Sequence, residues 1–194
     1  MPRNSDKRDR LVSAAQALLH RQGYSQTTLS DIAEASDVPL GNVYYYFKTK
    51  EDIAAAVIEN RRRELARYYQ AWQDTISNPL SRLRALLAHA REIAIEITDN
   101  GCPVGSLCQE LNKDQARLSE LSGRILDDQV QWVARQLESS GISHALHQAR
   151  YFIAQLQGSI LLANSLKDSS ILLDQLDVLD DWLDSNDQEQ VSSA

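Results

Sequence analysis

The stretch from Thr27 to Lys50 concentrates side chains that can bind a charged polymer rich in hydrogen-bonding groups. Asn42 is followed by three consecutive tyrosines at 44–46, and lysines stand at 48 and 50. Hydroxyl and ammonium groups bind phosphate oxygens, and an asparagine amide can both donate to and accept from the edge of a base. These residue types at this spacing indicate contacts with the major groove of double-stranded DNA.

Two short helices joined by a tight turn must hold these side chains outward. Thr27-Thr28 supplies a hydroxyl cap for a helix at 29–35, Ser36-Asp37-Val38 forms the turn, and Pro39 opens a helix at 40–47. Helices this short bury little surface alone, so we expect them to pack on a longer helix at 5–22 that Gly23 ends. The expected inward side chains are Leu29, Ile32, Ala33, Val38, Val43 and Phe47, and the expected outward ones are Leu40, Gly41, Asn42, Tyr44, Tyr45 and Tyr46. For Tyr46 a place in the helical core is an equal alternative.

The rest of the chain also has helical periodicity, with breaks at Ser77-Asn78-Pro79, 99–103 and 139–141. We therefore predict an all-α protein of about nine helices. Its predicted domains are a helix-turn-helix DNA-binding domain at 1–50, a helical ligand-binding and dimerisation domain at 51–184, and a polar tail at 185–194. The helix predicted between the first two breaks spans 80–97 without interruption.

Charge is unevenly distributed along the 194 residues. The net charge is −7, but residues 1–63 carry ten basic and eight acidic side chains, whereas the remainder carries ten basic and nineteen acidic ones. Salt screens electric fields beyond ~10 Å, so phosphate binding depends on local basic groups. An acidic remainder therefore does not prevent a basic end from binding DNA.

Composition excludes several other classes. No apolar run approaches the ~18 residues of a membrane span, and the charged first ten residues lack a signal-peptide core. Two cysteines provide neither a disulfide scaffold nor a zinc ligand set. We expect a cytoplasmic protein with no membrane partner, no metal and no cofactor.

The N-terminal region resembles the DNA-binding domain of the TetR family of transcriptional regulators. The matching positions fall within about residues 8–55, with Asp37 in place of the usual glycine and Ile53 in place of the usual leucine. They are Ala14-Ala15, Gly23, Thr27-Thr28, Ile32-Ala33, the run from Val38 to Phe47, and Lys50. The resemblance implies a homodimeric one-component regulator. In the simplest case it is a repressor that binds a palindromic operator and is released by a small molecule, an electrophile or an oxidant.

The resemblance also implies roles for the residues of the motif. Phosphate contacts fall to Thr28, Tyr44, Lys48 and Lys50, and base edges face Leu40, Gly41, Asn42, Tyr45 and Tyr46. Each helix-turn-helix reads one half-site, so two recognition helices about 34–36 Å apart, or a multiple of that, are needed. This geometry requires a dimer.

Apolar stripes on the last two helices, at 144–167 and 170–184, suit a dimer interface, which similar family members form as a four-helix bundle. Gly158 and Ser159 would permit close approach. The full predicted interface is Phe152, Leu156, Gly158, Ser159, Ile160, Ala163, Leu172, Leu176, Leu179 and Leu183. The alternative is that both stripes face the core of their own subunit.

The segment from Gly101 to Leu111 resembles an element of one TetR subgroup, which often has Pro-Leu-Gly-Asn as at 39–42. Some relatives respond to electrophiles or oxidants through a cysteine at the position of Cys102, and others bind metabolites reversibly. Cys102 precedes a short helix whose dipole would favour a thiolate, whereas Cys108 lies within that helix. An inert, buried role for both thiols is the alternative, and a disulfide between them is disfavoured because loop and helix would have to bend together.

By the same analogy a ligand cavity lies between the helices of the second domain. The candidate contacts, for each of which an ordinary core position is the favoured alternative, are Tyr68, Tyr69, Trp72, His89, Ile93, Cys102, Cys108, Trp132 and Phe152.

Three other interpretations stay open. A transcriptional activator of the same fold has the same sequence features. A small helical thiol enzyme would use Cys102 with His89 or His144, but no triad spacing or phosphate-binding loop accompanies them. A helical interaction module that does not bind DNA would leave the outward tyrosines unexplained.

Overall fold

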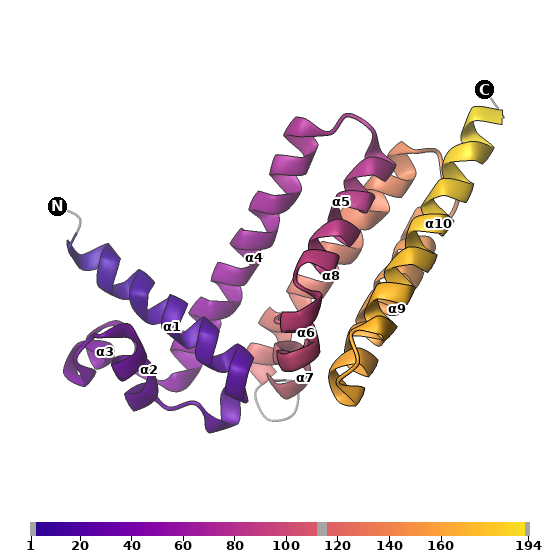
Figure 1. Cartoon of the computed structure of the whole chain (residues 1–194). Helices are drawn as coiled ribbons and strands as arrows, with labels where there is room; N and C mark the ends of the chain where they lie inside the picture. Colours follow the sequence, from indigo (N-terminus) through magenta and orange to yellow (C-terminus); the bar gives the residue numbers. More distant parts are fainter. Residues whose placement is uncertain (1–2, 112–115, 193–194) are drawn as a thin grey trace. The chain divides into compact units, whose positions relative to one another are not determined.

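The computed structural model describes residues 3–111 and 116–192, with the side chains of 6–111 and 117–187. All regular elements in these ranges are α-helices (Figure 1), which confirms the predicted all-α fold. They are α1 (Arg3–Gln26), α2 (Leu29–Ser36), α3 (Leu40–Tyr46), α4 (Lys50–Thr75), α5 (Pro79–Glu92), α6 (Ala94–Asn100), α7 (Gly105–Leu111), α8 (Ala116–Ser139), α9 (Ala145–Leu166) and α10 (Ser170–Ser192).

The single helix predicted at 80–97 is in fact divided into α5 and α6. Ile93 lies between them with φ −102° and ψ 16°, outside the helical region. Its N–H still donates to the carbonyl of His89 at 3.3 Å, and its carbonyl accepts from the N–H of Ile97 at 2.9 Å. The apolar stripe therefore continues across the break, which is why periodicity did not reveal it.

The last helix, predicted to end at 184, in fact continues to Ser192, so the described part of the polar segment that begins at 185 is helical. Asn186 donates from Nδ2 to the carbonyl of Trp182 at 2.7 Å, and Asp187 lies within 3.5 Å of the guanidinium of Arg84. These contacts extend the helix past its last apolar stripe residue. Residues 193–194 lie outside the described part.

Side-chain caps fix the starts of three helices. Thr28 and Asp31 form a reciprocal capping box at α2, with Thr28 Oγ1 accepting from the N–H of Asp31 at 3.1 Å. Thr49 and Asp52 form the same pair at α4. Asn78 caps α5 by accepting from the N–H of Ser81 at 2.9 Å. Each cap satisfies an N–H that has no partner within its helix.

The helices pack as two compact units, described separately here. The head unit contains Met1–Leu65 and Pro103–Ile125, and the body unit contains Ala66–Cys102 and Leu126–Ala194. This division differs from the predicted boundary at residue 50, because α7 and the first part of α8 pack with the N-terminal helices. The functional domains at 1–50 and 51–184 stay a prediction.

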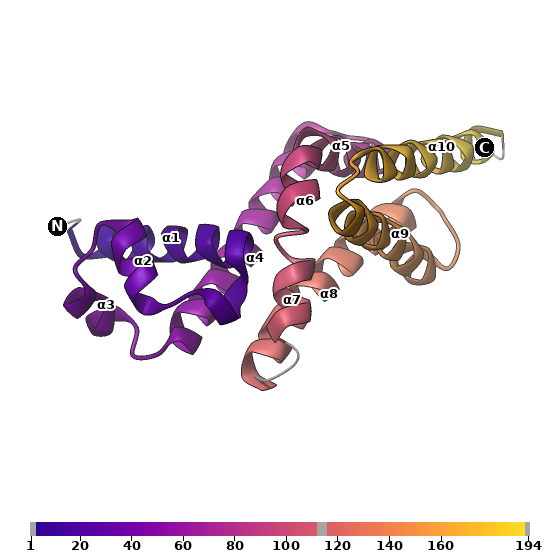
Figure 2. The ribbon, with the colours of Figure 1, turned by 60° about the horizontal axis from the view of Figure 1, so that its bottom comes forward.

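In the head unit α1 packs against α2 and α7, and α2 packs against α3 (Figure 2). Leu11, Ala15, Ile32 and Val43 are completely buried there. The second helix of the helix-turn-helix is therefore held only through its inward face.

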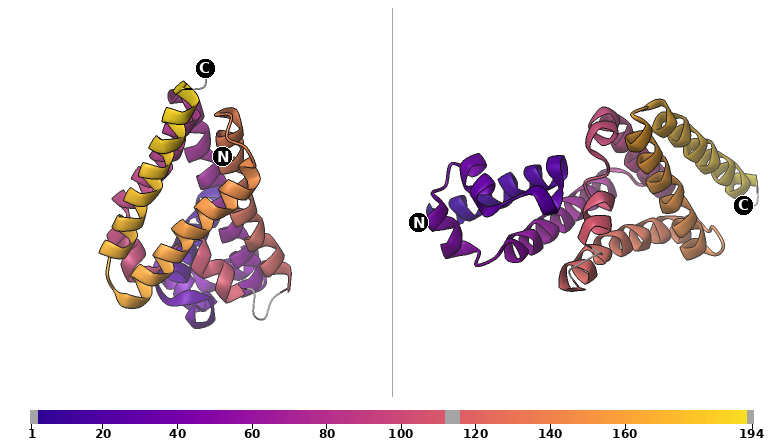
Figure 3. Two further views of the ribbon diagram at one scale, coloured as in Figure 1. Left: turned by 90° about the vertical axis from the view of Figure 1, so that its right-hand side faces the viewer. Right: turned by 90° about the horizontal axis from the view of Figure 1, so that it is seen from below.

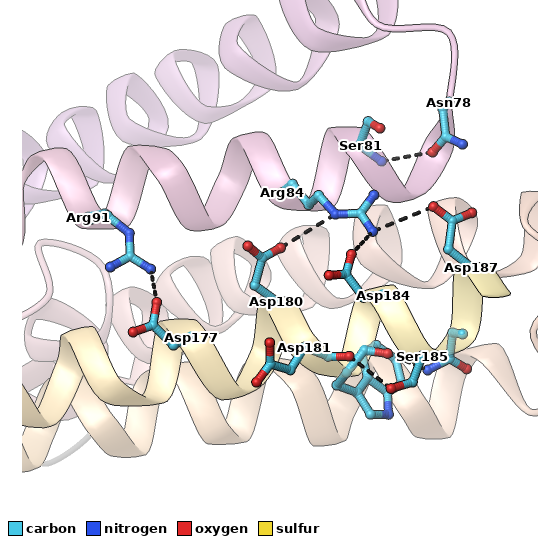
Figure 4. Close-up of polar contacts among 12 residues, drawn as sticks. Asn78, Ser81, Arg84, Arg91, Asp177, Asp180, Asp181, Asp184, Ser185 and Asp187 are labelled. Carbon is cyan, nitrogen blue, oxygen red and sulfur yellow. Dashed lines mark hydrogen bonds and ion pairs between the residues drawn. The ribbon is translucent and has the colours of Figure 1, made fainter.

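In the body unit α9 and α10 form a hairpin, which Figure 3 shows from two sides, and α10 also packs against α5. Arg84 on α5 lies between three carboxylates of α10, at 3.4 Å from Asp180, 2.6 Å from Asp184 and 3.5 Å from Asp187 (Figure 4). Arg91 pairs with Asp177 one helical turn before Asp180. A connected set of pairs fixes the register of the two helices better than isolated surface pairs do.

Candidate functional site

Helix α3 presents two different faces. Val43 is fully buried and Phe47, just after the helix, is 4% exposed, whereas Tyr45 is 69% exposed. Tyr44 and Leu40 are 48% and 40% exposed. The predicted inward and outward orientations of these five side chains are therefore confirmed.

The three remaining outward positions differ from one another. Gly41 is exposed, and a Cβ atom added there would contact nothing within 4 Å. Asn42 is half-buried. Tyr46 is half-buried with its ring edge-on to Tyr45, at a centroid distance of 5.0 Å. A partner approaching α3 would therefore meet Tyr45 and Gly41 before Tyr46.

The turn between α2 and α3 depends on Arg10, which the sequence analysis missed. Asp37 adopts the left-handed conformation with φ 52°, which aspartate tolerates better than most residues. Arg10 on α1 donates from Nη2 to the carbonyl oxygens of Ser36 and Asp37 and to the carboxylate of Asp37. This contact attaches the turn to α1. The sequence alone identified Arg10 only as a basic residue.

The predicted phosphate ligands at the edges of α3 are exposed to different degrees. Thr28 is exposed, but its hydroxyl accepts the cap hydrogen bond. Lys48 is exposed and donates to the carbonyl of Tyr44 at 3.0 Å. Lys50 is half-buried and donates to the carbonyls of Tyr24 at 2.8 Å and Ser25 at 3.3 Å. Of the two lysines, Lys48 is the freer to reach a phosphate.

The body unit contains a cluster of aromatic side chains from α4, α5 and α8. The rings of Tyr69 and Trp132 stack with centroids 4.3 Å apart, and Trp72 lies 5.8 Å from Trp132. His89 lies 4.7 Å from Tyr68, beside the same rings. The fold thus brings together five of the side chains predicted to line a ligand cavity.

Three polar atoms in this cluster have no hydrogen-bond partner among the described residues. They are the Tyr69 hydroxyl, Gln129 Oε1 and Trp132 Nε1, and all three side chains are more than nine-tenths buried. Burial raises the pKa of Tyr69 most, and the negative charges of Asp128 and of a Cys102 thiolate raise it further. The nearby Gln129 amide opposes this rise in pKa, although it does not meet hydrogen-bond geometry with the hydroxyl. Buried polar atoms without a partner cost free energy, so these three atoms are available to hydrogen-bond a water or another small molecule.

The remaining predicted ligand contacts lie elsewhere. Phe152 is fully buried against Trp182, at a centroid distance of 6.2 Å, and Ile93 is half-buried at the break between α5 and α6. Cys108 is buried in the head unit, where its thiol donates to the carbonyl of Ser122 at 3.2 Å. Cys102 is half-buried in the body unit, and both thiols are free. Phe152 and Cys108 are therefore core residues, whereas Cys102 lies near enough to Tyr69 in the body unit to affect the pKa of its hydroxyl.

A depression of about 530 Å³ opens at the junction of α8 and α9. Six of the nine residues that line it are polar or charged: Gln131, Arg135, Glu138, His144, His147 and Arg150. None of the residues predicted to contact a ligand lines it.

The residues predicted to form the dimer interface lie mostly in the core of the single chain, which was the alternative reading of the two stripes. Nine of the ten residues are buried within the single chain, because both apolar stripes close on each other and on α5. Only Gly158 is exposed. The opposite faces of the hairpin carry a different apolar set: Tyr151, Leu161, Leu162 and Leu166 on α9 and Val178 on α10, each between 50% and 65% exposed.

No described helix combines the length and apolar character needed to cross a bilayer. No group of three histidine, cysteine or acidic side chains arranged to hold a metal ion occurs in the described ranges.

Comparison with known proteins places this geometry in a class. Residues 11–57 match the family described as bacterial regulatory proteins, tetR family. The chain is 29% identical over 184 residues to an uncharacterised HTH-type transcriptional regulator in the lacX 3' region of Lactococcus lactis subsp. lactis, covering 89% of this chain and 90% of that protein. It is 25% identical over 146 residues to the HTH-type transcriptional repressor NemR of Escherichia coli, covering 73% of this chain and 72% of NemR.

Solved structures show the same fold over nearly the whole chain. The regulatory protein TetR from Rhodobacter sphaeroides has a TM-score of 0.76 and 28% identity, covering 92% of this chain and 97% of that chain. The reduced form of Escherichia coli NemR has a TM-score of 0.78 and 21% identity, covering 91% of this chain and 96% of that chain.

The fold, the exposed recognition helix and these matches define a helix-turn-helix transcriptional regulator that acts by binding DNA. Residues 11–57 therefore match the DNA-binding part of the tetR family, and the chain is similar over most of its length to regulators of that kind. The matched proteins are regulators and not enzymes, so the thiol-enzyme interpretation is set aside.

Proposed function

We propose that this chain is a homodimeric repressor that binds a palindromic operator with α3 of each subunit in successive major grooves. The observation that most supports this is the outward face of α3, where Tyr45 is 69% exposed although it is aromatic. A side chain of that kind gains most from a grooved, polar partner. The description of the relative NemR as a repressor supports repression over activation.

The residue roles follow from exposure and chemistry. Tyr45 and Asn42 contact base edges, and Leu40 contacts a thymine methyl group, because Asn reads hydrogen-bonding edges and apolar side chains read that methyl. Gly41 lets the helix approach the DNA closely. Tyr46 lies at the margin of this surface.

The phosphate contacts come from the two ends of the motif. Thr28 at the start of α2 and Tyr44 on α3 provide hydroxyls, and Lys48 provides an exposed ammonium. Lys50 reaches a phosphate only if it leaves the carbonyls that it binds here, so we assign it the smallest contribution.

The dimer forms through the outward face of the α9–α10 hairpin. Tyr151, Gly158, Leu162 and Leu166 follow one another on α9 at intervals of seven, four and four residues, the spacing of one helix face. All four are exposed in the single chain, and Gly158 has open space around it. A second copy that covers these apolar side chains would supply the second recognition helix that a palindromic site requires.

The effector binds beside the aromatic cluster of the body unit. The Tyr69 hydroxyl and Trp132 Nε1 can donate, and Gln129 Oε1 can accept, so an effector with a carbonyl oxygen and a hydrogen-bond donor fits the three buried atoms. Effector binding acts by shifting the population of conformers. A bias of ~3 kcal/mol toward a conformer with the wrong separation of recognition helices lowers operator affinity about a hundredfold.

We also propose that electrophiles act as effectors by reacting with Cys102, as in the TetR subgroup with the Gly-Cys-Pro segment. Its half-buried thiolate would attack an alkylating carbon, forming an S–C bond while the leaving group departs with the bonding electrons. We expect iodoacetamide to release the wild-type protein from its operator and to have no effect on Cys102→Ser. Cys108→Ser is the matched control and should behave as the wild type. Normal release of Cys102→Ser under iodoacetamide would exclude this thiol as the sensor.

Selection of binding sites from random duplex DNA tests the proposed function directly. We expect a palindromic sequence to be enriched, with affinity that falls steeply as salt rises. Transcription in vitro from a promoter overlapping that site should then decrease when the protein is added. Failure to enrich any sequence would refute operator binding, and increased transcription would favour an activator.

A further inference from the structure

We propose that Glu110, on α7, is a positioning residue for operator binding, and this inference rests on the proposed function. Its two carboxylate oxygens accept from consecutive backbone N–H groups in the head unit. Oε2 accepts from Tyr24 at 2.7 Å, and Oε1 accepts from Ser25 at 2.7 Å. The acceptor comes from a helix that lies 85 residues away in sequence but packs directly on α1.

These two N–H groups need an acceptor because Gly23 interrupts α1. Gly23 has φ 82° and ψ 167°, which breaks the helical ladder, so the residues after it begin a new turn with unpaired N–H groups. A carboxylate forms short, charge-assisted hydrogen bonds to such groups. A Cβ atom at Gly23 would lie 2.9 Å from Glu110 Oε2, so glycine is needed both for its conformation and for this close approach.

Lys50 binds the carbonyl groups of the same two residues. Its ammonium contacts the carbonyls of Tyr24 and Ser25 and lies 4.3 Å from the centre of the Tyr24 ring. The N–H groups are therefore held by a negative charge from α7 and the carbonyls by a positive charge from the start of α4. The pKa of Tyr24 is raised by burial and then by the charges of Glu51 and Glu110, which agrees with a carboxylate held close.

The turn fixed in this way leads directly into the DNA-binding helices. Thr27 is fully buried and donates from Oγ1 to the carbonyl of Gly23 at 2.7 Å, and the next residue, Thr28, caps α2. Because α2 packs against α3, a displaced turn would displace the recognition helix. A further contact in the head unit joins α8 to the start of α4, the helix that carries Lys50: Arg117 lies 3.6 Å from carboxylate oxygens of both Glu51 and Asp52.

The effect of removing a negative charge on DNA affinity distinguishes a positioning role from a general electrostatic role. Removing an acidic side chain from the head unit makes that unit more positive, which by itself favours binding to phosphate. A positioning role predicts the opposite result for Glu110, because the turn would lose its acceptor. Glu120 is the matched control: it is exposed, lies in the same unit and pairs only with Arg124 among the contacts described for it.

The experiment uses the full chain and the operator selected from random DNA. We expect Glu110→Ala to weaken operator binding at least tenfold, whereas Glu120→Ala should bind equally well or more tightly. Amide hydrogen exchange should become faster at Tyr24 and Ser25 in Glu110→Ala only. Glu110→Gln keeps one acceptor oxygen, so it should restore part of the affinity and part of the protection.

Three outcomes would overturn the assignment. One is operator affinity of Glu110→Ala equal to or above that of the wild type. Another is unchanged exchange at both amides, and the last is a Glu110→Gln protein no better than the alanine variant. If Glu110→Ala does not fold, Glu110→Gln measured against Glu120→Gln decides the question. Failure of the wild type to select any sequence would refute the proposed function itself, which is a distinct result.

Discussion

The recognition helix α3 and the α9–α10 hairpin both carry apolar side chains at helical spacing, yet they use them differently. On α3 the inward residues Val43 and Phe47 anchor the helix, and the exposed residues form the candidate binding surface. On the hairpin the regular stripe that includes Leu156 and Leu176 closes the core of the same chain. The candidate interface lies on the less regular outer face, which includes Leu162.

This difference shows what a hydrophobic stripe does and does not predict. A stripe identifies the side of a helix that is buried, but it does not identify what buries it. On α3 the buried face could be assigned to the core of the head unit, because a seven-residue helix can anchor itself by one face only. The hairpin helices have 22 and 23 residues and enough surface for two contacts, one within the chain and one outside it.

The largest effect is expected from Leu176→Ala, which tests the inner stripe of the hairpin. Leu176 is fully buried, and removing a buried leucine side chain costs about 2–5 kcal/mol of unfolding free energy. Denaturant unfolding followed by circular dichroism measures this loss. A cost below about 1 kcal/mol would mean that the stripe is not core.

Leu162→Asp tests the outer face of the same hairpin. Leu162 is 53% exposed, so the helical content should be unchanged, but a carboxylate in an apolar interface should shift the dimer to monomer. Sedimentation velocity and operator binding should both show the loss. Leu146→Asp, on α9 but outside the proposed surface, should remain dimeric. A Leu162→Asp dimer of normal affinity would place the interface elsewhere.

Tyr45→Ala tests the outer face of α3. A lost base contact costs about 1–3 kcal/mol, which is roughly a tenfold to hundredfold loss of operator affinity. Unfolding free energy should change by less than about 0.5 kcal/mol, because the side chain is exposed. Val43→Ala should behave in the opposite way, with lower stability as its primary defect. Equal affinities of Tyr45→Ala and wild type for the selected site would contradict the base-reading role.

Lys48→Ala separates phosphate contacts from base contacts on the same unit. Binding should weaken similarly for operator and unrelated DNA, and the slope of log K against log salt should fall by about 1 per subunit. Lys50→Ala should change this slope less, because its ammonium binds Tyr24 and Ser25. Titrations at several salt concentrations distinguish the two. A larger slope change for Lys50→Ala than for Lys48→Ala would show that Lys50 is the stronger phosphate contact.

The smallest effect concerns the cap of α2. Hydrogen bonds from the N–H and side chain of Thr28 lower the pKa of Asp31 below its ordinary value of 3.8. A carboxyl with a lowered folded pKa contributes stability above its unfolded pKa and loses it as the pH falls through the folded one. Asp31→Asn should therefore be slightly less stable than wild type near neutral pH, and the difference should shrink in acid below 3.8. A difference that is independent of pH would show that the carboxylate charge does not matter.

The recognition motif could be predicted because its signals are local. The cap at Thr28, proline at the start of α3 and alternation of Val43 with tyrosines act within a few residues of each other. Arg10 and Glu110 could not be assigned, since Glu110 contacts backbone groups and Arg10 contacts two backbone carbonyls besides the carboxylate of Asp37. Their partners lie 26 or more residues away.

The sequence by itself determined most of the helices, the cap of α2 and the residues that α3 turns outward, because short-range hydrogen bonding and periodicity decide those features. Only the tertiary structure decided which stripe faces which neighbour, that α7 packs with the N-terminal helices, and that Glu110 and Lys50 hold one turn between opposite charges. Contacts between distant segments depend on how the faces of many helices fit at once, and no local pattern encodes that fit.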